Sequence, residues 1–123
     1  MFHILVVDDD KNSRLFLTAL LEEAGYTVTA AIDGEDALEK MDRSHVDLVV
    51  LDIMMPRMDG ITALIELRHE RNIPVIFLTA KSEDTDMILG LNVGADDYIT
   101  KPFNINKIIS LFTHFISLYE LIL

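Results

Sequence analysis

Short apolar runs alternate along the chain with longer amphipathic stretches. Residues 4–7, 48–51 and 75–78 are fully apolar and rich in β-branched or aromatic side chains. Runs of this length and composition indicate strands that are buried on both faces, as in a parallel sheet. Residues 26–31 and 98–100 are weaker strand candidates. The pattern therefore predicts five strands.

Helical patterns fill the intervals between these runs. In residues 13–24 the apolar positions Leu15, Phe16, Ala19 and Leu20 follow helical spacing, and Gly25 is a C-terminal stop. Asp33 and Gly34 lead into a short helix that runs through Leu38 and Met41. Three more helices are expected, over residues 61–71, over residues 82–93, and from residue 104 or 106 towards the C-terminus.

Strands and helices thus alternate five times, which predicts an α/β fold with a doubly wound parallel sheet and helices on both faces. Right-handed crossovers leave few topologies for such a chain. The five-stranded solution has the order 2-1-3-4-5 and is flavodoxin-like. No linker or repeat interrupts the pattern, so we expect residues 1–123 to form a single domain.

Composition narrows the classes of function. The formal net charge of −11 would repel nucleic acid phosphates, so we expect no direct nucleic acid binding by this chain. Cysteine is absent, which excludes disulfides and thiolate metal sites. No stretch has the about 20 apolar residues of a membrane span, and the N-terminus does not resemble a signal peptide. We therefore expect a cytoplasmic protein.

Polar residues follow the predicted strands where a ligand would bind. In such a sheet, ligands bind beyond the carboxyl ends of the strands, beside the point where the strand order reverses. Asp8 and Asp9 follow the first strand, Asp52 the third, Thr79 the fourth and Lys101 the fifth. These five side chains are therefore expected to converge on one cleft.

These residue types suit phosphoryl transfer. Three neighbouring carboxylates repel one another, and Mg²⁺ relieves this because it prefers carboxylate oxygens, waters and a phosphate oxygen. A carboxylate can accept a phosphoryl group and form an aspartyl phosphate. A lysine ammonium and a threonine hydroxyl can bind the transferred oxygens. For Asp10 a helix N-cap is the preferred interpretation.

Other types of site lack their motifs. No P-loop, no dinucleotide-binding glycine fingerprint and no nucleophile elbow occur in the sequence. The histidines His3, His45, His69 and His114 have no metal-ligand spacing, and we interpret them as surface or structural residues.

Four motifs resemble the receiver domain of bacterial two-component response regulators. The resemblance covers residue 4 to about residue 109 and is closest to the class that carries a winged-helix DNA-binding domain. The motifs are ILVVDDD at residues 4–10, DIMMPRMDG at 52–60, LTA at 78–80 and GADDYITKPF at 94–103.

The resemblance implies a role for each matching residue of the site. Asp52 corresponds to the phosphoacceptor. Asp9 and Asp52 correspond to the direct carboxylate ligands of Mg²⁺, the Met54 backbone carbonyl to a third protein ligand, and Asp8 to an acid that reaches the metal through water. Lys101 corresponds to the lysine that pairs with the phosphate.

Thr79 and Tyr98 correspond to the family's switch pair, whose hydroxyl and ring reorient after phosphorylation. The resemblance implies a sensor histidine kinase as phosphoryl donor and the control of transcription as output. It also implies that the chain catalyses only its own phosphorylation and dephosphorylation, and is not otherwise an enzyme.

Two other functions would use part of the same pattern. A Mg²⁺-dependent phosphohydrolase with an aspartyl-phosphate intermediate usually has a second acid two residues after the nucleophile, where this chain has Met54. A flavin-binding electron carrier would need a Ser-, Thr- and Gly-rich phosphate loop after the first strand, where the chain has aspartates at 8–10.

The C-terminal region departs from the resemblance. Members of the winged-helix class form dimers through charged pairs, but Met87, Lys107 and Leu111 stand where other residue types are usual. Residues 108–123 are unusually apolar. Two explanations stay open: truncation in a poorly ordered end, or an apolar face that supports a homodimer through the last helix.

Overall fold

The computed structural model describes residues 2–52, 73–80 and 97–101, together with positions 62, 65, 66, 110, 113, 114 and 117; for residues 79, 80 and 97–101 it describes the backbone alone. Within these ranges the elements follow in the order β1 (His3–Val7), α1 (Lys11–Glu23), β2 (Thr27–Ala31), α2 (Gly34–Arg43), β3 (Leu48–Asp52), β4 (Val75–Ala80) and β5 (Asp97–Lys101).

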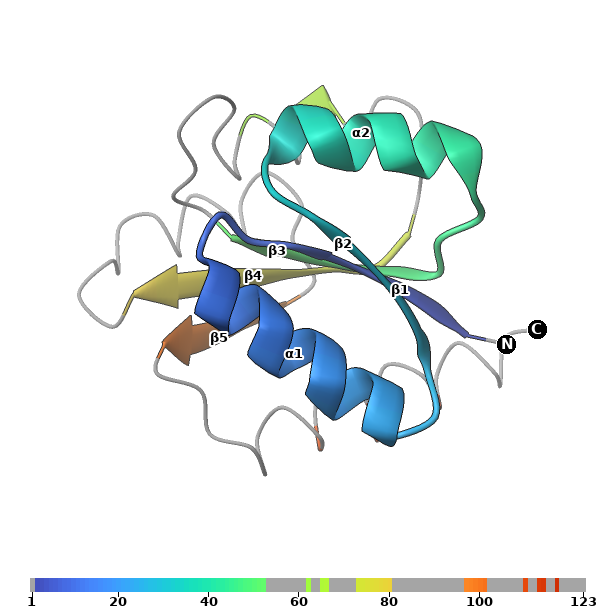
Figure 1. Ribbon diagram of the computed structural model, residues 1–123, viewed down its shortest axis with the longest axis vertical. Coiled ribbons are helices and arrows are strands. Elements are labelled where there is room, and N and C mark those ends of the chain that lie inside the picture. The colour runs from blue at the N-terminus through green and yellow to red at the C-terminus, as the bar shows by residue number, and fades with distance from the viewer. Residues whose placement is uncertain are drawn as a thin grey trace.

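The five strands form one parallel sheet with the order β2-β1-β3-β4-β5 (Figure 1). The predicted strand order is therefore confirmed. β1 pairs with β2 on one side and with β3 on the other, so the strand order reverses at β1. Val7 lies level with Leu51 across the β1–β3 pair, which brings the carboxyl ends of these two central strands together.

The core has one layer on each face of the sheet. Alternate residues of β1, β3 and β4 point to opposite faces, because side chains alternate along a strand. One layer contains Leu5, Leu51 and Phe77 and is covered by Ala37 and Met41 of α2. The other layer is covered by α1 and contains Ile4, Val6, Leu48, Val50, Ile76 and Leu78. β1 and β3 are thus buried on both faces, as their continuous apolar runs predict.

The two ends of α1 are set by local hydrogen bonds. Asp10 is the N-cap, and its side chain accepts a hydrogen bond from the Ser13 backbone N–H. At the other end, Gly25 has a φ of 99°, a region that favours glycine. The Gly25 N–H donates to the Glu22 carbonyl and the Tyr26 N–H to the Leu21 carbonyl, which is a Schellman motif.

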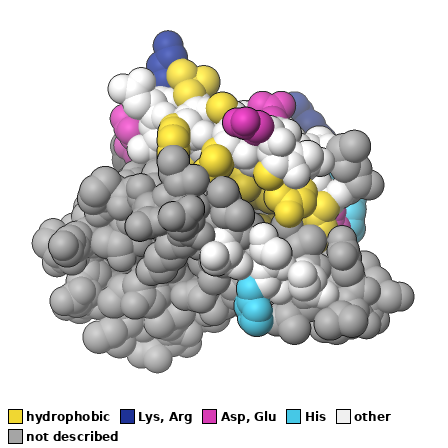
Figure 2. Space-filling view, turned by 90° about the horizontal axis from the view of Figure 1, so that it is seen from below, with side chains coloured by type: hydrophobic (Ala, Val, Ile, Leu, Met, Phe, Trp, Pro, Cys, Tyr) yellow, Lys and Arg dark blue, Asp and Glu magenta, His cyan; other side chains and the backbone are white. Residues whose placement is uncertain are grey.

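The buried face of α1 differs from the one that the spacing suggests. Leu17 and Leu21 are the buried residues of the helix, whereas Leu15 is 56% exposed and Phe16 is 41% exposed. Ala19 is also exposed, and Leu20 is partly buried against the core. Figure 2 views the side on which α1 lies and shows hydrophobic side chains at the surface there.

At the amino ends of the strands, hydrogen bonds join two histidines and a buried carboxylate. Asp47 accepts hydrogen bonds from the His3 backbone N–H and from His45 Nε2, both at 2.8 Å. The His3 ring contacts the His45 carbonyl oxygen and the Thr29 hydroxyl. His3 and His45 therefore have structural roles, as expected; His114 is exposed, and His69 lies outside the described residues.

The remaining predicted helices lie largely outside the described residues. Thr62, Ile65 and Glu66 are helical, within the range expected for the third helix. Positions 110, 113, 114 and 117 are helical within the range expected for the last one. The helix expected over residues 82–93 lies entirely outside. In the described part of the chain, no helix has the length and apolar character needed to cross a membrane.

Candidate functional site

Three carboxylates lie at the carboxyl ends of two neighbouring strands. Asp52 is the last residue of β3, and Asp8 and Asp9 follow directly after β1. The parallel pairing of β1 with β3 places Asp8 one residue beyond Val7, which is level with Leu51. The carboxyl ends of both strands therefore bring together residues that are more than 40 positions apart in the sequence.

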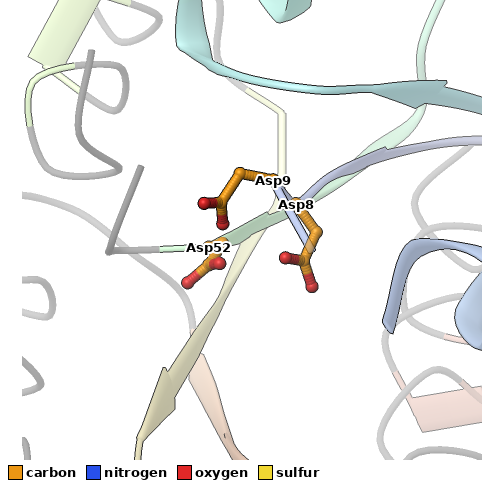
Figure 3. A group of neighbouring side chains, drawn as sticks. All are labelled: Asp8, Asp9 and Asp52. Atoms are coloured by element: carbon orange, nitrogen blue, oxygen red, sulfur yellow. The ribbon is translucent and has the colours of Figure 1, made fainter. Parts of the chain in front are cut away.

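The carboxylate groups of Asp8, Asp9 and Asp52 form what we call the acidic cluster. Each offers an oxygen, and these oxygens lie within 4.8 Å of one another (Figure 3). Asp8 and Asp52 are buried, at 0% and 4% exposure, whereas Asp9 is exposed. The proximity that the sequence predicts for these three residues is confirmed.

This arrangement fits a divalent cation. Two unit charges 4 Å apart repel each other by about 1 kcal/mol in water and by about 4 kcal/mol in the less polar surroundings of a protein. Here three acidic groups meet at about that separation, and two of them are shielded from water. Oxygen ligands at mixed burial suit a hard ion such as Mg²⁺, which keeps some of its water.

The turn between β1 and α1, residues 8–13, is fixed by hydrogen bonds; we call it the β1–α1 corner. The Asp8 backbone N–H donates to the Ala31 carbonyl at 3.1 Å, so the β1–β2 pairing continues one residue beyond β1. Asp8 Oδ1 accepts from the Asp10 N–H at 2.9 Å. Asp10 Oδ2 accepts from both the N–H and the hydroxyl of Ser13. Asp10 is therefore a helix cap, as predicted, and is not in the acidic cluster.

Arg14 is a neighbour of the site that the sequence analysis missed. Its Nη1 donates a hydrogen bond of 2.9 Å to the Asp8 backbone carbonyl. Side chains on a helix point back towards its N-terminus, so an arginine in the second turn of α1 can reach the end of the preceding strand. An arginine six residues after an aspartate at a strand end is thus a signal that could have identified this contact.

The other predicted site residues are described in part or not at all. Thr79 lies near the end of β4, one residue beyond Leu78, which is level with Asp52. Lys101 is the last residue of β5, and Tyr98 is level with Phe77. Their backbones thus approach the edge that bears the acidic cluster, but their side chains are outside the described part. Met54 lies outside the described residues altogether.

Comparisons with known proteins agree with this geometry. The family model described as "Response regulator receiver domain" matches residues 4–113. A probable transcriptional regulator, ycf27 of Porphyridium aerugineum, is 52% identical over 101 residues, which cover 82% of this chain and 42% of that protein. The alkaline phosphatase synthesis transcriptional regulatory protein PhoP of Bacillus subtilis is 49% identical over 102 residues, with the same coverage.

The chain thus spans less than half of the length of these curated relatives. Among solved structures, the receiver domain of the Francisella response regulator 1452 superposes with a TM-score of 0.85 and 40% sequence identity, over 94% of this chain and 96% of that one. The matched residues include all of the sheet except His3, the first residue of β1, and all three members of the acidic cluster. The chain therefore belongs to the response regulator receiver domain family, the phosphorylation-dependent switch module of two-component signalling.

Proposed function

We propose that Asp52 accepts a phosphoryl group from a phosphohistidine on a sensor histidine kinase. In this step an oxygen of Asp52 forms a bond to phosphorus while the phosphorus–nitrogen bond breaks, and the released imidazole takes up a proton. The observation that carries the proposal is the acidic cluster, in which a buried carboxylate at the end of β3 lies within 4.8 Å of two others. A carboxylate is a competent acceptor for phosphoryl transfer.

The acidic cluster would hold one Mg²⁺. In this proposal Asp9 and Asp52 bind the cation directly, Asp8 acts through a water, and the Met54 backbone carbonyl is a further ligand. When bound, the cation would neutralise charge on the phosphoryl group. Asp8 and Asp9 thus contribute by keeping a cation beside the acceptor.

The remaining roles follow from the resemblance and from the strand ends on which the residues lie. Lys101 would pair with the phosphoryl oxygens, and the Thr79 hydroxyl would hydrogen-bond to them. Thr79 and Tyr98 would form the switch, because the phosphorylated state binds one arrangement of these residues better than the other. We infer that the chain also catalyses its own dephosphorylation.

The proposal extends to the cellular context. We infer that residues 1–123 form one receiver domain and that the output is control of transcription, because the matched relatives are named as transcriptional regulators. We also propose a cytoplasmic location, which cell fractionation would test. Neither direct nucleic acid binding nor membrane binding is assigned to this chain.

The acceptor can be tested by mass spectrometry of the intact chain. Incubation with acetyl phosphate and Mg²⁺ should add one phosphoryl group, and Asp52→Asn should abolish the gain. Asp42→Asn is the matched control, because it removes one carboxylate from an exposed position on α2 and should leave phosphorylation unchanged. An equal mass gain in Asp52→Asn would contradict the assignment.

The metal ligands can be tested by calorimetry. Asp9→Asn should weaken Mg²⁺ binding by more than the about 10-fold to 100-fold loss that follows removal of an outer partner of a metal ligand. Asp10→Asn is the control, because it removes a charge beside the acidic cluster while asparagine still caps α1. If the two variants lose affinity equally, general charge and not direct ligation accounts for the binding.

A further inference from the structure

Arg14 joins α1 to the peptide that links two members of the acidic cluster. Its Nη1 donates to the carbonyl oxygen of Asp8 at 2.9 Å, in a partly buried position. That carbonyl belongs to the same peptide group as the Asp9 N–H. A planar peptide moves as a unit, so a hydrogen bond to its oxygen also restricts its nitrogen and the next Cα. Arg14 therefore acts on the backbone that carries Asp9.

Asp9 depends on its backbone more than Asp8 does. Asp8 is fully buried, and its Oδ1 is held by the Asp10 N–H. Asp9 is exposed, and among the residues that the structure describes no hydrogen bond or ion pair holds its carboxylate. The direction of the Asp9 Cα–Cβ bond is set by the φ and ψ of the β1–α1 corner, which the Arg14 contact restrains.

The charge of Arg14 and its hydrogen bond act on a bound cation in opposite directions. A positive guanidinium near the acidic cluster repels a divalent cation. A fixed peptide orients a ligand in advance and favours the same cation, as outer partners of metal ligands do. The two effects therefore predict opposite changes in Mg²⁺ affinity when Arg14 is replaced.

We propose that Arg14 is a positioning residue, which fixes the Asp8–Asp9 peptide so that Asp9 is oriented for Mg²⁺. This inference rests on the proposed role of Asp9 as a metal ligand. Arg14 does not itself contact the cation in this scheme. In this proposal the hydrogen bond outweighs the repulsion, because the guanidinium donates to a backbone oxygen and so fixes the peptide that carries Asp9.

Three variants separate these effects in calorimetric titrations with Mg²⁺. Arg14→Met removes both the charge and the donor and should weaken binding by about 10-fold. Arg14→Lys keeps the charge and one donor group. Its affinity for Mg²⁺ should lie between that of the parent protein and that of Arg14→Met. Arg43→Met is the matched control: it removes an arginine that is 72% exposed and pairs with Glu39 on α2, and it should leave affinity unchanged.

Nuclear magnetic resonance offers a readout without any metal. The amide signals of Asp9 and Asp10 should shift in Arg14→Met and stay in place in Arg43→Met, because the first variant alone releases the Asp8 carbonyl. Unchanged or tighter Mg²⁺ binding by Arg14→Met would overturn the inference, even with a lower melting temperature. If Arg14→Met does not fold, Arg14→Lys provides the test. A Mg²⁺ affinity of Arg14→Lys equal to that of the parent protein would contradict the positioning role of the Arg14 hydrogen bond.

The result is distinguishable from a failure of the proposed metal site. If Asp9→Asn weakens Mg²⁺ binding and Arg14→Met does not, only the positioning role of Arg14 is wrong. If Asp9→Asn also binds Mg²⁺ with parental affinity, the ligand assignment itself is wrong.

Discussion

Asp10 follows two members of the acidic cluster in the sequence, but its role is to cap the N-terminus of α1. Its side chain accepts hydrogen bonds from the N–H and the hydroxyl of Ser13 in the first turn of α1. Loss of an N-cap side chain typically costs about 1 kcal/mol. We therefore expect Asp10→Ala to lower the free energy of unfolding by about 1 kcal/mol in urea denaturation, while phosphorylation of the folded protein by acetyl phosphate continues.

Glu23→Ala is the control for this prediction. It removes the same charge from the other end of α1, where a negative side chain is unfavourable next to the helix dipole. Its free energy of unfolding should therefore stay the same or rise. Equal losses in both variants would point to net charge rather than to capping.

At the scale of single residues, the sequence predicts the acidic cluster well and its surroundings poorly. Asp8, Asp9 and Asp52 are recognisable because each follows an apolar run, and the ends of adjacent parallel strands must meet. Arg14 is less obvious because its partner is a backbone carbonyl, so only its spacing of six residues from Asp8 could indicate the contact. The side chains of Thr79, Tyr98 and Lys101 lie outside the described part, and their roles stay predictions.

At the scale of elements, α1 shows what an apolar pattern leaves undecided. Residues 15–17 and 19–21 are all apolar, so they cover more than one face of the helix. Helical spacing alone therefore does not decide whether the buried face of α1 contains Leu15 and Phe16 or Leu17 and Leu21. The sheet decides between them, because only one face of α1 can pack on β1, β3 and β4.

The buried face of α1 can be tested by truncating one leucine at a time. Leu17→Ala should lower the free energy of unfolding by about 2–5 kcal/mol, because the buried side chain leaves a cavity. Leu15→Ala is the matched control in the same helix. At 56% exposure it should change stability by only about 0.5 kcal/mol. Urea denaturation measures both, and the reverse order would restore the face expected from the sequence.

The strands are easier to predict than the helix face. β1 and β3 are buried almost throughout, so each appears as an uninterrupted apolar run. β2 lies at the edge of the sheet, and its burial is partial. That partial burial explains why its sequence, which mixes threonine with apolar residues, is a weaker signal.

At the scale of the whole molecule, the sequence predicts that two chains associate through the last helix. Met87, Leu111 and Leu118 lie outside the described residues. Burial of one leucine contributes about 1.5–3 kcal/mol, whereas an exposed ion pair contributes about 0–1 kcal/mol. A few leucines, doubled by a two-fold axis, could thus replace the charged contacts that the family uses in its dimers.

We therefore expect the chain to form a homodimer whose stability depends little on salt. Leu111→Glu combined with Leu118→Glu should produce a monomer in analytical ultracentrifugation, and this monomer should still accept phosphate. A parent chain that is already monomeric at high concentration would reject the association face and favour the alternative explanation of the apolar end.

The strand order also has a consequence for synthesis on the ribosome. Asp52 ends β3, so the first 52 residues contain three adjacent strands, β2-β1-β3, and the whole acidic cluster. A chain emerges from its N-terminus at about 5–20 residues per second. These strands can therefore pair before β4 and β5 emerge from the ribosome. If Mg²⁺ binds as proposed, it would meet the nascent carboxylates before Lys101 emerges and would act first as a ligand that stabilises folding.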